Sequence, residues 1–359
     1  MGVHWVGQDI GMAVLGGALI SFSSILNLVF SGRVTGLSGM FFTLLRGKAS
    51  EGLVWKYSFM SGLLGVCYLV FLTAGRSISL GSYDYSIYDS NSKSTENLHV
   101  VGWMLGGFLV GVGTKLGNGC TSGHGVCGLS RLSMRSFVAV GTFMGTGVAI
   151  ATFRHYVPFL DSTQSFGSGY DSVFRIVADT LIGAMIGGYL YLATRKLTNK
   201  EGFEKWDPVI SFFAGVLFGL GLVLSGMCRR TKIVAFLTLA DGWDPSLMFV
   251  MGTAIAINLP TWQYILRKWS KPILAESFQM PSKTNLDVPV VLGPALFGLG
   301  WGICGFCPGP GMVNLFVIDH AILFAVFLAI GQLAVSWYSS FMEKRKAASD
   351  LSTPIAQEK

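Results

Sequence analysis

The sequence predicts an all-α integral membrane protein of about nine transmembrane helices, with four short re-entrant segments between them. Of the 359 residues, 51% are hydrophobic and only 13% are charged, which is too apolar for a soluble protein of this length. Apolar segments of about 20 residues, the length that crosses a bilayer, recur along the whole chain. Glycine-rich polar segments that are too short to cross interrupt them.

Each element follows from these segments in order. The predicted spans cover residues 10–30, 53–75, 99–116, 135–157, 173–194, 208–225, 246–266, 288–304 and 319–341. The four re-entrant inserts cover residues 31–47, 117–131, 225–240 and 305–316. Residues 1–9 lack the basic segment of a signal peptide, so the first span is expected to be retained. The polar connection at 76–96 is expected to be a solvated hairpin without chemistry of its own.

An internal repeat relates the two halves of the chain. The matched segments are Leu28–Gly32 with Leu222–Gly226, Thr43–Gly47 with Thr238–Gly242, and Leu109–Gly113 with Leu296–Gly300. Continuing the last register places Cys120 opposite Cys307. The predicted domains are a first repeat (1–172), an inverting span and linker (173–207), a second repeat (208–342) and a cytoplasmic tail (343–359).

The basic residues predict the orientation. Most Lys and Arg residues fall in alternate connections, so the positive-inside rule places the N-terminus outside and the C-terminus in the cytoplasm of a plasma-membrane protein. The net charge of +7 therefore reflects topology and not nucleic-acid binding. The lone fifth span inverts the second half, so the inserts enter in pairs from opposite faces and meet near the midplane. The predicted shape is an hourglass.

Three cations in the third insert depart from this charge bias. Arg229, Arg230 and Lys232 lie on the predicted outer side, where they would concentrate an anionic substrate at a vestibule. Alternatively, they extend to lipid headgroups, and Lys115 carries the same ambiguity. Acidic residues are nearly absent from the inserts, which argues against a carboxylate-lined path for cations or protons.

The cysteines give the sharpest chemical prediction. All six lie in or beside apolar segments and are expected to be free thiols: Cys67, Cys120, Cys127, Cys228, Cys304 and Cys307. A thiol in a dry constriction stays protonated, because burial disfavours the thiolate, and its S–H group can donate to an anion that contains sulfur. Cys120 and Cys307 are predicted to relay such an ion, and Cys228 to meet it earlier. Cys67, inside an uninterrupted span, is expected to be a small hydrophobe.

Polar residues of the second insert could assist. Asn118, Thr121 and Ser122 could donate to the substrate or satisfy carbonyls of their own loop, and His124 could do either. The complete predicted substrate path comprises Cys120, Cys307, Cys228, Cys127, Cys304, Asn118, Thr121, His124, Arg229, Arg230 and Lys232.

Two motifs carry a family resemblance. The segment Gly117–Arg131, GNGCTSGHGVCGLSR, together with Gly302–Gly309, GICGFCPG, resembles the YeeE/YedE sulfur-transport family. The resemblance covers nearly the whole chain and implies an hourglass fold that imports thiosulfate through S–H···S contacts, with essential cysteines at Cys120 and Cys307. Members often carry a cysteine shortly after the first span, where this chain has Val34, which cannot donate a hydrogen bond.

Other chemistries remain open. Cys304 and Cys307 could form the redox pair of a membrane thiol-disulfide oxidoreductase, although the βαβ setting of such pairs is absent. Cys120, His124, Cys127 and that pair could instead ligate metal in a metal-ion transporter. An anion channel without sulfur selectivity would also use backbone N–H groups and arginines.

The favoured prediction is a non-enzymatic importer of a small sulfur-containing anion, thiosulfate first, without cofactor or bound metal. No nucleotide-binding Gly-x-x-x-x-Gly-Lys-Ser/Thr motif occurs. The bilayer and the anion are the expected partners, and a cytoplasmic sulfur-acceptor protein could consume the substrate.

Overall fold

The structure is a computed structural model of the chain. It describes residues 2–3, 6–47, 52–80, 83–89, 98–161, 171–199, 203–281, 283, 285–318 and 320–352. The first half contains α1 (Gly7–Ser31), α2 (Leu37–Arg46), α3 (Leu53–Ala74), α4 (Val100–Leu116), the π-helix η1 (Thr121–Gly128) and α5 (Met134–Tyr156). Between the halves lie α6 (Asp171–Asn199) and the short η3 (Phe203–Trp206). The second half contains α7 (Asp207–Leu224), α8 (Arg230–Leu237), α9 (Ser246–Lys268), α10 (Val288–Cys304), α11 (Pro308–Val313), η4 (Asn314–Phe316) and α12 (Ala321–Ser352).

The described helices identify an integral multi-pass membrane protein. Five of them are long and apolar enough to cross a bilayer, namely α1, α3, α5, α7 and α12. Two further pairs, α4 with η1 and α10 with the α11–η4 segment, are each bent by 45° at a short break, which gives up to seven spans if each pair is one. Every predicted span coincides with a helix. The last one differs at its end, because α12 continues to Ser352 through residues expected to form a tail.

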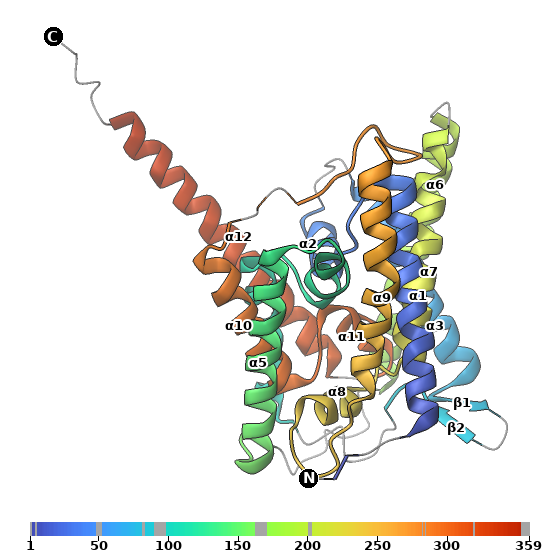
Figure 1. Cartoon of the computed structure of the whole chain (residues 1–359), viewed down its shortest axis with the longest axis vertical. Helices are drawn as coiled ribbons and strands as arrows, with labels where there is room; N and C mark the ends of the chain where they lie inside the picture. Colours follow the sequence, from blue (N-terminus) through green and yellow to red (C-terminus); the bar gives the residue numbers. More distant parts are fainter. Residues whose placement is uncertain are drawn as a thin grey trace.

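The long helices stand roughly side by side, and helices of the first half pack directly on helices of the second (Figure 1). The pair α1 and α7 runs antiparallel, since Ser31 Oγ at the end of α1 donates to Asp207 Oδ1 at the start of α7, at 2.7 Å. The pair α4 and α10 is equally close, because a Cβ built on Gly113 would lie 2.6 Å from the carbonyl oxygen of Gly293. Small residues permit such close approach between membrane helices.

The short elements α2, η1, α8 and α11 lie between the long helices (Figure 1). The chain enters or leaves them through residues in the left-handed region. Three pairs that the sequence repeat matches share this conformation: Gly32 (φ 65°) with Gly226 (φ 75°), Gly47 (φ 57°) with Gly242 (φ 83°), and Asn118 (φ 60°) with Gly305 (φ 73°). The second insert is more regular than expected, because Thr121–Gly128 forms a π-helix where the glycines predicted an irregular loop.

The connection after α3 differs from the solvated hairpin predicted at residues 76–96, of which 81–82 and 90–96 lie outside the described residues. Strands β1 (Ser77–Leu80) and β2 (Tyr83–Ser86) do form an antiparallel hairpin. However, Tyr85 and Tyr88 are fully buried, and the Tyr88 hydroxyl donates to the carbonyl oxygen of Cys67 at 3.0 Å. Asp89, which is 4% exposed, accepts hydrogen bonds from the Arg230 N–H (2.6 Å) and the Thr231 N–H (3.3 Å). This connection therefore supplies the N-terminal cap of α8.

Candidate functional site

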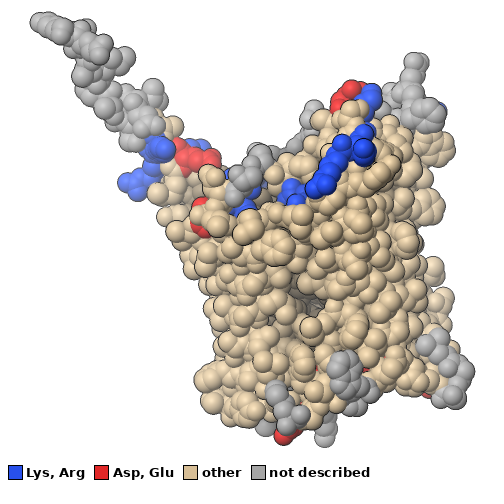
Figure 2. All heavy atoms as spheres, viewed as in Figure 1, with Lys and Arg blue, Asp and Glu red and all other residues tan. Residues whose placement is uncertain are grey.

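A cavity of about 310 Å³ brings the two predicted relay cysteines together. Cys120 and Cys307 both line it, together with Thr121, Ser122 and Trp301, and most of its remaining wall is apolar. We call it the thiol cavity. Met248 of α9 also lines it and is 54% exposed, so the cavity reaches the outer face of the helical bundle. Figure 2 shows the surface hollowed about halfway down this face.

The two cysteines hold equivalent positions in the two short elements. Cys120 is the N-cap of η1 (φ −134°, ψ −166°), and Cys307 is the N-cap of α11 (φ −96°, ψ 167°). Both have extended backbone, and their side chains are 2% and 5% exposed. Cys120 Sγ lies 3.4 Å from Ser122 Oγ. Each thiol therefore stands at the first turn of a helix, on the side where peptide N–H groups lack intrahelical partners.

The other cysteines lie outside the thiol cavity and contact protein groups. Cys127 Sγ lies 3.3 Å from Ser24 Oγ and 3.6 Å from the carbonyl oxygen of Thr35. The Cys304 thiol donates to the carbonyl oxygen of Gly300 at 3.0 Å. Cys67 and Cys228 are fully buried. All six are free thiols, as the sequence predicts, so no disulfide joins Cys304 to Cys307.

Sequence reasoning missed a set of methionines. Four methionines from three different parts of the chain line the thiol cavity: Met144 in α5, Met227 after α7, and Met248 and Met251 in α9. A methionine in an apolar segment is normally predicted to be a buried core residue, so the sequence around these four residues does not indicate that they line a cavity. Their thioether sulfurs are soft and polarizable, which gives the cavity wall a chemistry that leucine would not provide.

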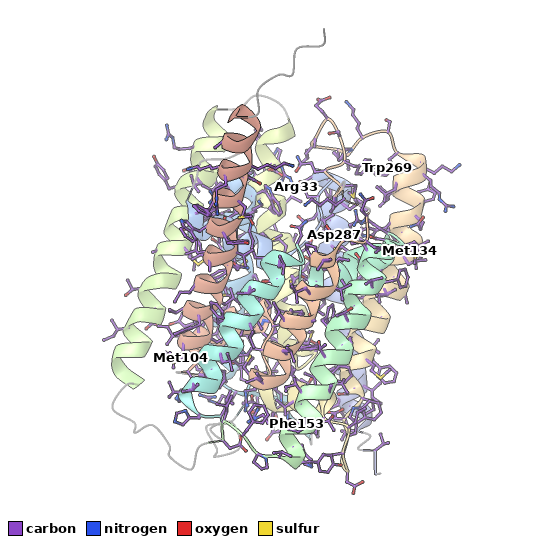
Figure 3. All side chains as sticks on the ribbon, turned by 90° about the vertical axis from the view of Figure 1, so that its left-hand side faces the viewer. Arg33, Met104, Met134, Phe153, Trp269 and Asp287 are labelled. Atoms are coloured by element: carbon purple, nitrogen blue, oxygen red, sulfur yellow. The ribbon has the colours of Figure 1, made fainter. Side chains whose placement is uncertain are left out.

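A second cavity, of about 150 Å³, has the opposite character. Its polar lining includes Lys115, Arg131, Arg135 and Lys283, with Asn118 and His124 from the second insert. We call it the cationic cavity. Figure 2 shows Lys and Arg gathered at one end of the molecule, and Figure 3 shows Asp287 and Met134 at that end, away from Met104 and Phe153. Arg135 donates to Asp287 Oδ1 at 2.6 Å, which places this cavity at the same end.

His124 is held by the scaffold. Its Nε2 lies 3.2 Å from the carbonyl oxygen of Gly117, which can only accept, so Nε2 carries the proton. Its Nδ1 lies 3.1 Å from Ser136 Oγ, so in the neutral ring the Ser136 hydroxyl donates to it. The ring thus ties the start of the second insert to α5. Gly119 packs on this ring so closely that an added Cβ would lie 2.7 Å from it. His124 thus makes the hydrogen bonds of a loop residue, and because it also lines the cationic cavity, its predicted contact with a substrate stays a prediction.

The cations of the third insert are largely buried, and Arg230 lines a third cavity of about 270 Å³, so their predicted role at a vestibule stays a prediction. Arg230 and Lys232 are both 3% exposed. Lys232 Nζ lies 2.6 Å from Asp9 Oδ2, and Arg230 Nε donates to the carbonyl oxygen of Cys304 at 2.8 Å. Arg229 Nε is buried without a hydrogen-bond partner among the described residues. The acidic residue that pairs with Lys232 comes from another part of the chain, so the lack of carboxylates within the insert does not leave this cation unpaired.

The fold is that of a multi-pass membrane protein, and comparisons with known proteins indicate a transporter. Residues 207–348 match the family DUF6691, a family of unknown function. A probable transporter from Xylella fastidiosa strain Temecula1 is 40% identical over 126 residues, which are 34% of this chain and 84% of the relative. Another, from strain 9a5c, is 35% identical over 141 residues, or 39% of this chain and 91% of the relative. The chain belongs to this family of probable transporters.

Proposed function

We propose that this transporter imports a small sulfur-containing anion, thiosulfate first, into the cytoplasm, and that the anion passes between the protonated thiols of Cys120 and Cys307. The observation that carries the proposal is that both cysteines line one cavity from the N-caps of two short helices. The two motifs around them are also the segments that resemble the YeeE/YedE sulfur-transport family.

The transport path in this proposal depends on an inverted repeat of nine spans with an hourglass waist. Its two units are residues 1–172 and 208–342, with 173–207 as the inverting span. Three observations support it. The order of long and short helices is the same in both halves, three matched residue pairs share left-handed backbone, and α1 runs antiparallel to its counterpart α7. The Xylella relatives each match less than two-fifths of this chain, which fits a chain built from two half-length units.

The charge distribution supports an orientation with the C-terminus in the cytoplasm. Lys and Arg gather at the end from which α12 projects, while the N-terminus lies at the other end (Figures 1 and 2). The positive-inside rule assigns the Lys- and Arg-rich end to the cytoplasm of a plasma-membrane protein. In this orientation the thiol cavity is reached before the cationic cavity during import.

The lining of the thiol cavity favours a soft anion. An apolar wall compensates poorly for the lost hydration of an ion, so a uniformly hard anion such as sulfate is disfavoured there. The terminal sulfur of thiosulfate is polarizable and can accept from a thiol S–H group, and methionine sulfurs surround it with matching groups. The thiols of Cys127 and Cys304 contact protein groups, so we assign the relay itself to Cys120 and Cys307.

The test is uptake of radiolabelled thiosulfate by proteoliposomes. Cys120→Ala and Cys307→Ala should each reduce uptake to the level of empty liposomes, whereas Cys67→Ala, in a fully buried site outside the cavity, should keep it. Size-exclusion profiles should show that all three variants remain folded. An excess of sulfate should compete weakly. Undiminished thiosulfate uptake by both Cys120→Ala and Cys307→Ala would refute the proposed relay.

The methionines favour one second candidate, transport of a soft monovalent metal ion such as Cu(I). Thiol and thioether sulfurs are the ligands that such ions select. The described residues contain no group of three or more His, Cys, Asp or Glu side chains that could hold a metal, so this site would depend on the four methionines. Met251→Leu should then reduce Ag(I) binding by the purified protein, while thiosulfate import should tolerate the same change.

A further inference from the structure

One thin wall separates the thiol cavity from the cationic cavity. In η1, Ser122 lines the first and Gly123 lines the second. At the start of α2, Leu37 lines the first and Gly36 lines the second. The Leu37 N–H donates to Ser122 Oγ at 3.2 Å, and this bond joins the two elements. We call these four residues the partition. Ser122 Oγ also lies 3.4 Å from Cys120 Sγ, so the partition is next to one of the two proposed relay thiols.

The cations on the far side of the partition are largely uncompensated. Of the four that line the cavity, Arg135 is paired with Asp287. Within the described part of the chain, no acidic side chain forms an ion pair with Lys115 or Arg131. Lys115 Nζ lies 3.6 Å from the centre of the Phe42 ring, and Arg131 Nε is buried without a hydrogen-bond partner in the described ranges. Partly buried cations without counter-charges form a site for an anion.

A buried amide indicates that the cationic cavity is hydrated. Gln332 of α12 lines the cationic cavity and is 1% exposed. Its Nε2 donates to the carbonyl oxygen of Ser38 (3.1 Å) and to Thr114 Oγ1 (3.3 Å), but its Oε1 has no partner among the described residues. Because this oxygen only accepts, it requires a hydrogen-bond donor such as a water molecule, which could in turn donate to an anion in the cavity.

We propose that the cationic cavity is a second anion site, which binds small tetrahedral oxyanions through charge and hydrogen bonds to their oxygens. Its place in an import sequence rests on the proposed function, in which it receives the anion across the partition and holds it before release. The site contains no thiol, and Val34 lines it. It therefore recognises oxygen and charge, whereas the thiol cavity recognises sulfur.

Equilibrium binding tests the site without transport. The full-length protein in phosphatidylcholine nanodiscs should bind radiolabelled sulfate, and binding should weaken as salt rises. The double variant Lys115→Gln/Arg131→Gln should weaken binding by at least about tenfold, because each charge-assisted hydrogen bond contributes about that factor. Lys268→Gln, an exposed cation at the end of α9 outside the cavity, should bind as the wild type does. Lys115→Arg/Arg131→Lys should restore binding, which excludes a folding defect.

The failures of this proposal and of the proposed function are separable. The double variant Cys120→Ala/Cys307→Ala should still bind sulfate. If the wild type binds sulfate but does not import thiosulfate, the anion site is supported and the proposed thiosulfate relay is refuted. Wild-type affinity in Lys115→Gln/Arg131→Gln, or no binding by the wild type, would overturn the site. Phosphatidylglycerol headgroups carry the same chemistry as the free ion. If nanodiscs containing that lipid abolish sulfate binding, the native occupant is a lipid phosphate and the assignment to a transported anion fails.

Discussion

Lys232 and Lys115 are cations at opposite ends of the molecule, and they have different partners. At the end that contains α8, Lys232 is paired with Asp9, and the first turn of α8 is capped by Asp89. At the end that contains α2 and η1, Lys115 faces an aromatic ring, and Arg131 Nε has no hydrogen-bond partner in the part of the chain that the structure describes. Each end places cations next to a short helix between the same kinds of long helix. Lys232 has an acidic partner and Lys115 has none among the described residues, whereas Arg229 beside α8, like Arg131, has an Nε atom without a hydrogen-bond partner there.

This difference separates structural cations from cations that can serve a ligand. A buried charge must be neutralised, and a fixed carboxylate provides this within the fold. A cation that faces a cavity without such a partner can be neutralised by a bound anion. The Lys232–Asp9 ion pair fastens α8, whereas α2 and η1 line the cationic cavity proposed as a site. The following experiments measure how far this contrast holds.

The largest effect is expected at the Lys232–Asp9 ion pair. The Lys232 side chain is 1% exposed and the Asp9 side chain 13% exposed. Lys232→Met would therefore leave the largely buried Asp9 carboxylate without its closest charge partner. Breaking a buried pair from one side costs ~3–5 kcal/mol. Lys115→Met is the matched change at the other end, and it should cost less than about 1 kcal/mol, the contribution of a partly exposed cation–π contact. Unfolding of both variants in mixed micelles gives the two values. Equal losses would remove the contrast.

A smaller loss is expected when the cap of α8 is removed. Asp89→Ala deletes an acceptor for two backbone N–H groups of α8 and for the Thr231 hydroxyl. The loss should be about 2–3 kcal/mol, as for a charged cap whose donors remain buried. Asp84→Ala, at an exposed position of β2, should change stability by less than about 0.5 kcal/mol. Both follow from the same unfolding measurement. An unaltered Asp89→Ala variant would mean that water replaces the carboxylate.

The helices themselves were the most predictable feature of the chain. The span predicted at residues 288–304 coincides with α10, and that at 53–75 with α3. Bilayer thickness fixes the length of an apolar segment, so composition alone locates such helices. The repeat register also paired residues with the same unusual backbone, including Gly32 with Gly226. Glycine marks those positions because it adopts left-handed backbone at little cost.

The partners of the site could not be predicted in the same way. Asp89 reaches α8 from 141 residues away, in a connection whose composition suggested solvent. The cationic cavity collects Lys115, Arg131 and Gln332 from α4, the segment after η1, and α12. Of these residues, the sequence singled out only Lys115, and without a partner for it. Only three-dimensional packing decides which cation meets a carboxylate and which faces a cavity.

The smallest change in stability is expected at the two helix breaks that precede Cys120 and Cys307. Asn118 (φ 60°) and Gly305 (φ 73°) each lie two residues before a cavity cysteine in left-handed backbone. Gly305→Ala should cost about 1–2 kcal/mol for that conformation, and its Cβ would also come within 2.9 Å of Arg230 Cγ.

Asn118→Gly should change stability by less than about 1 kcal/mol, since asparagine already tolerates this region and glycine relieves the remaining strain. Thermal unfolding of both variants checks the pair. If Gly305→Ala unfolds at the same temperature as the wild type, the backbone before Cys307 accommodates a Cβ atom without loss of stability. The left-handed conformation at residue 305 would then not require glycine.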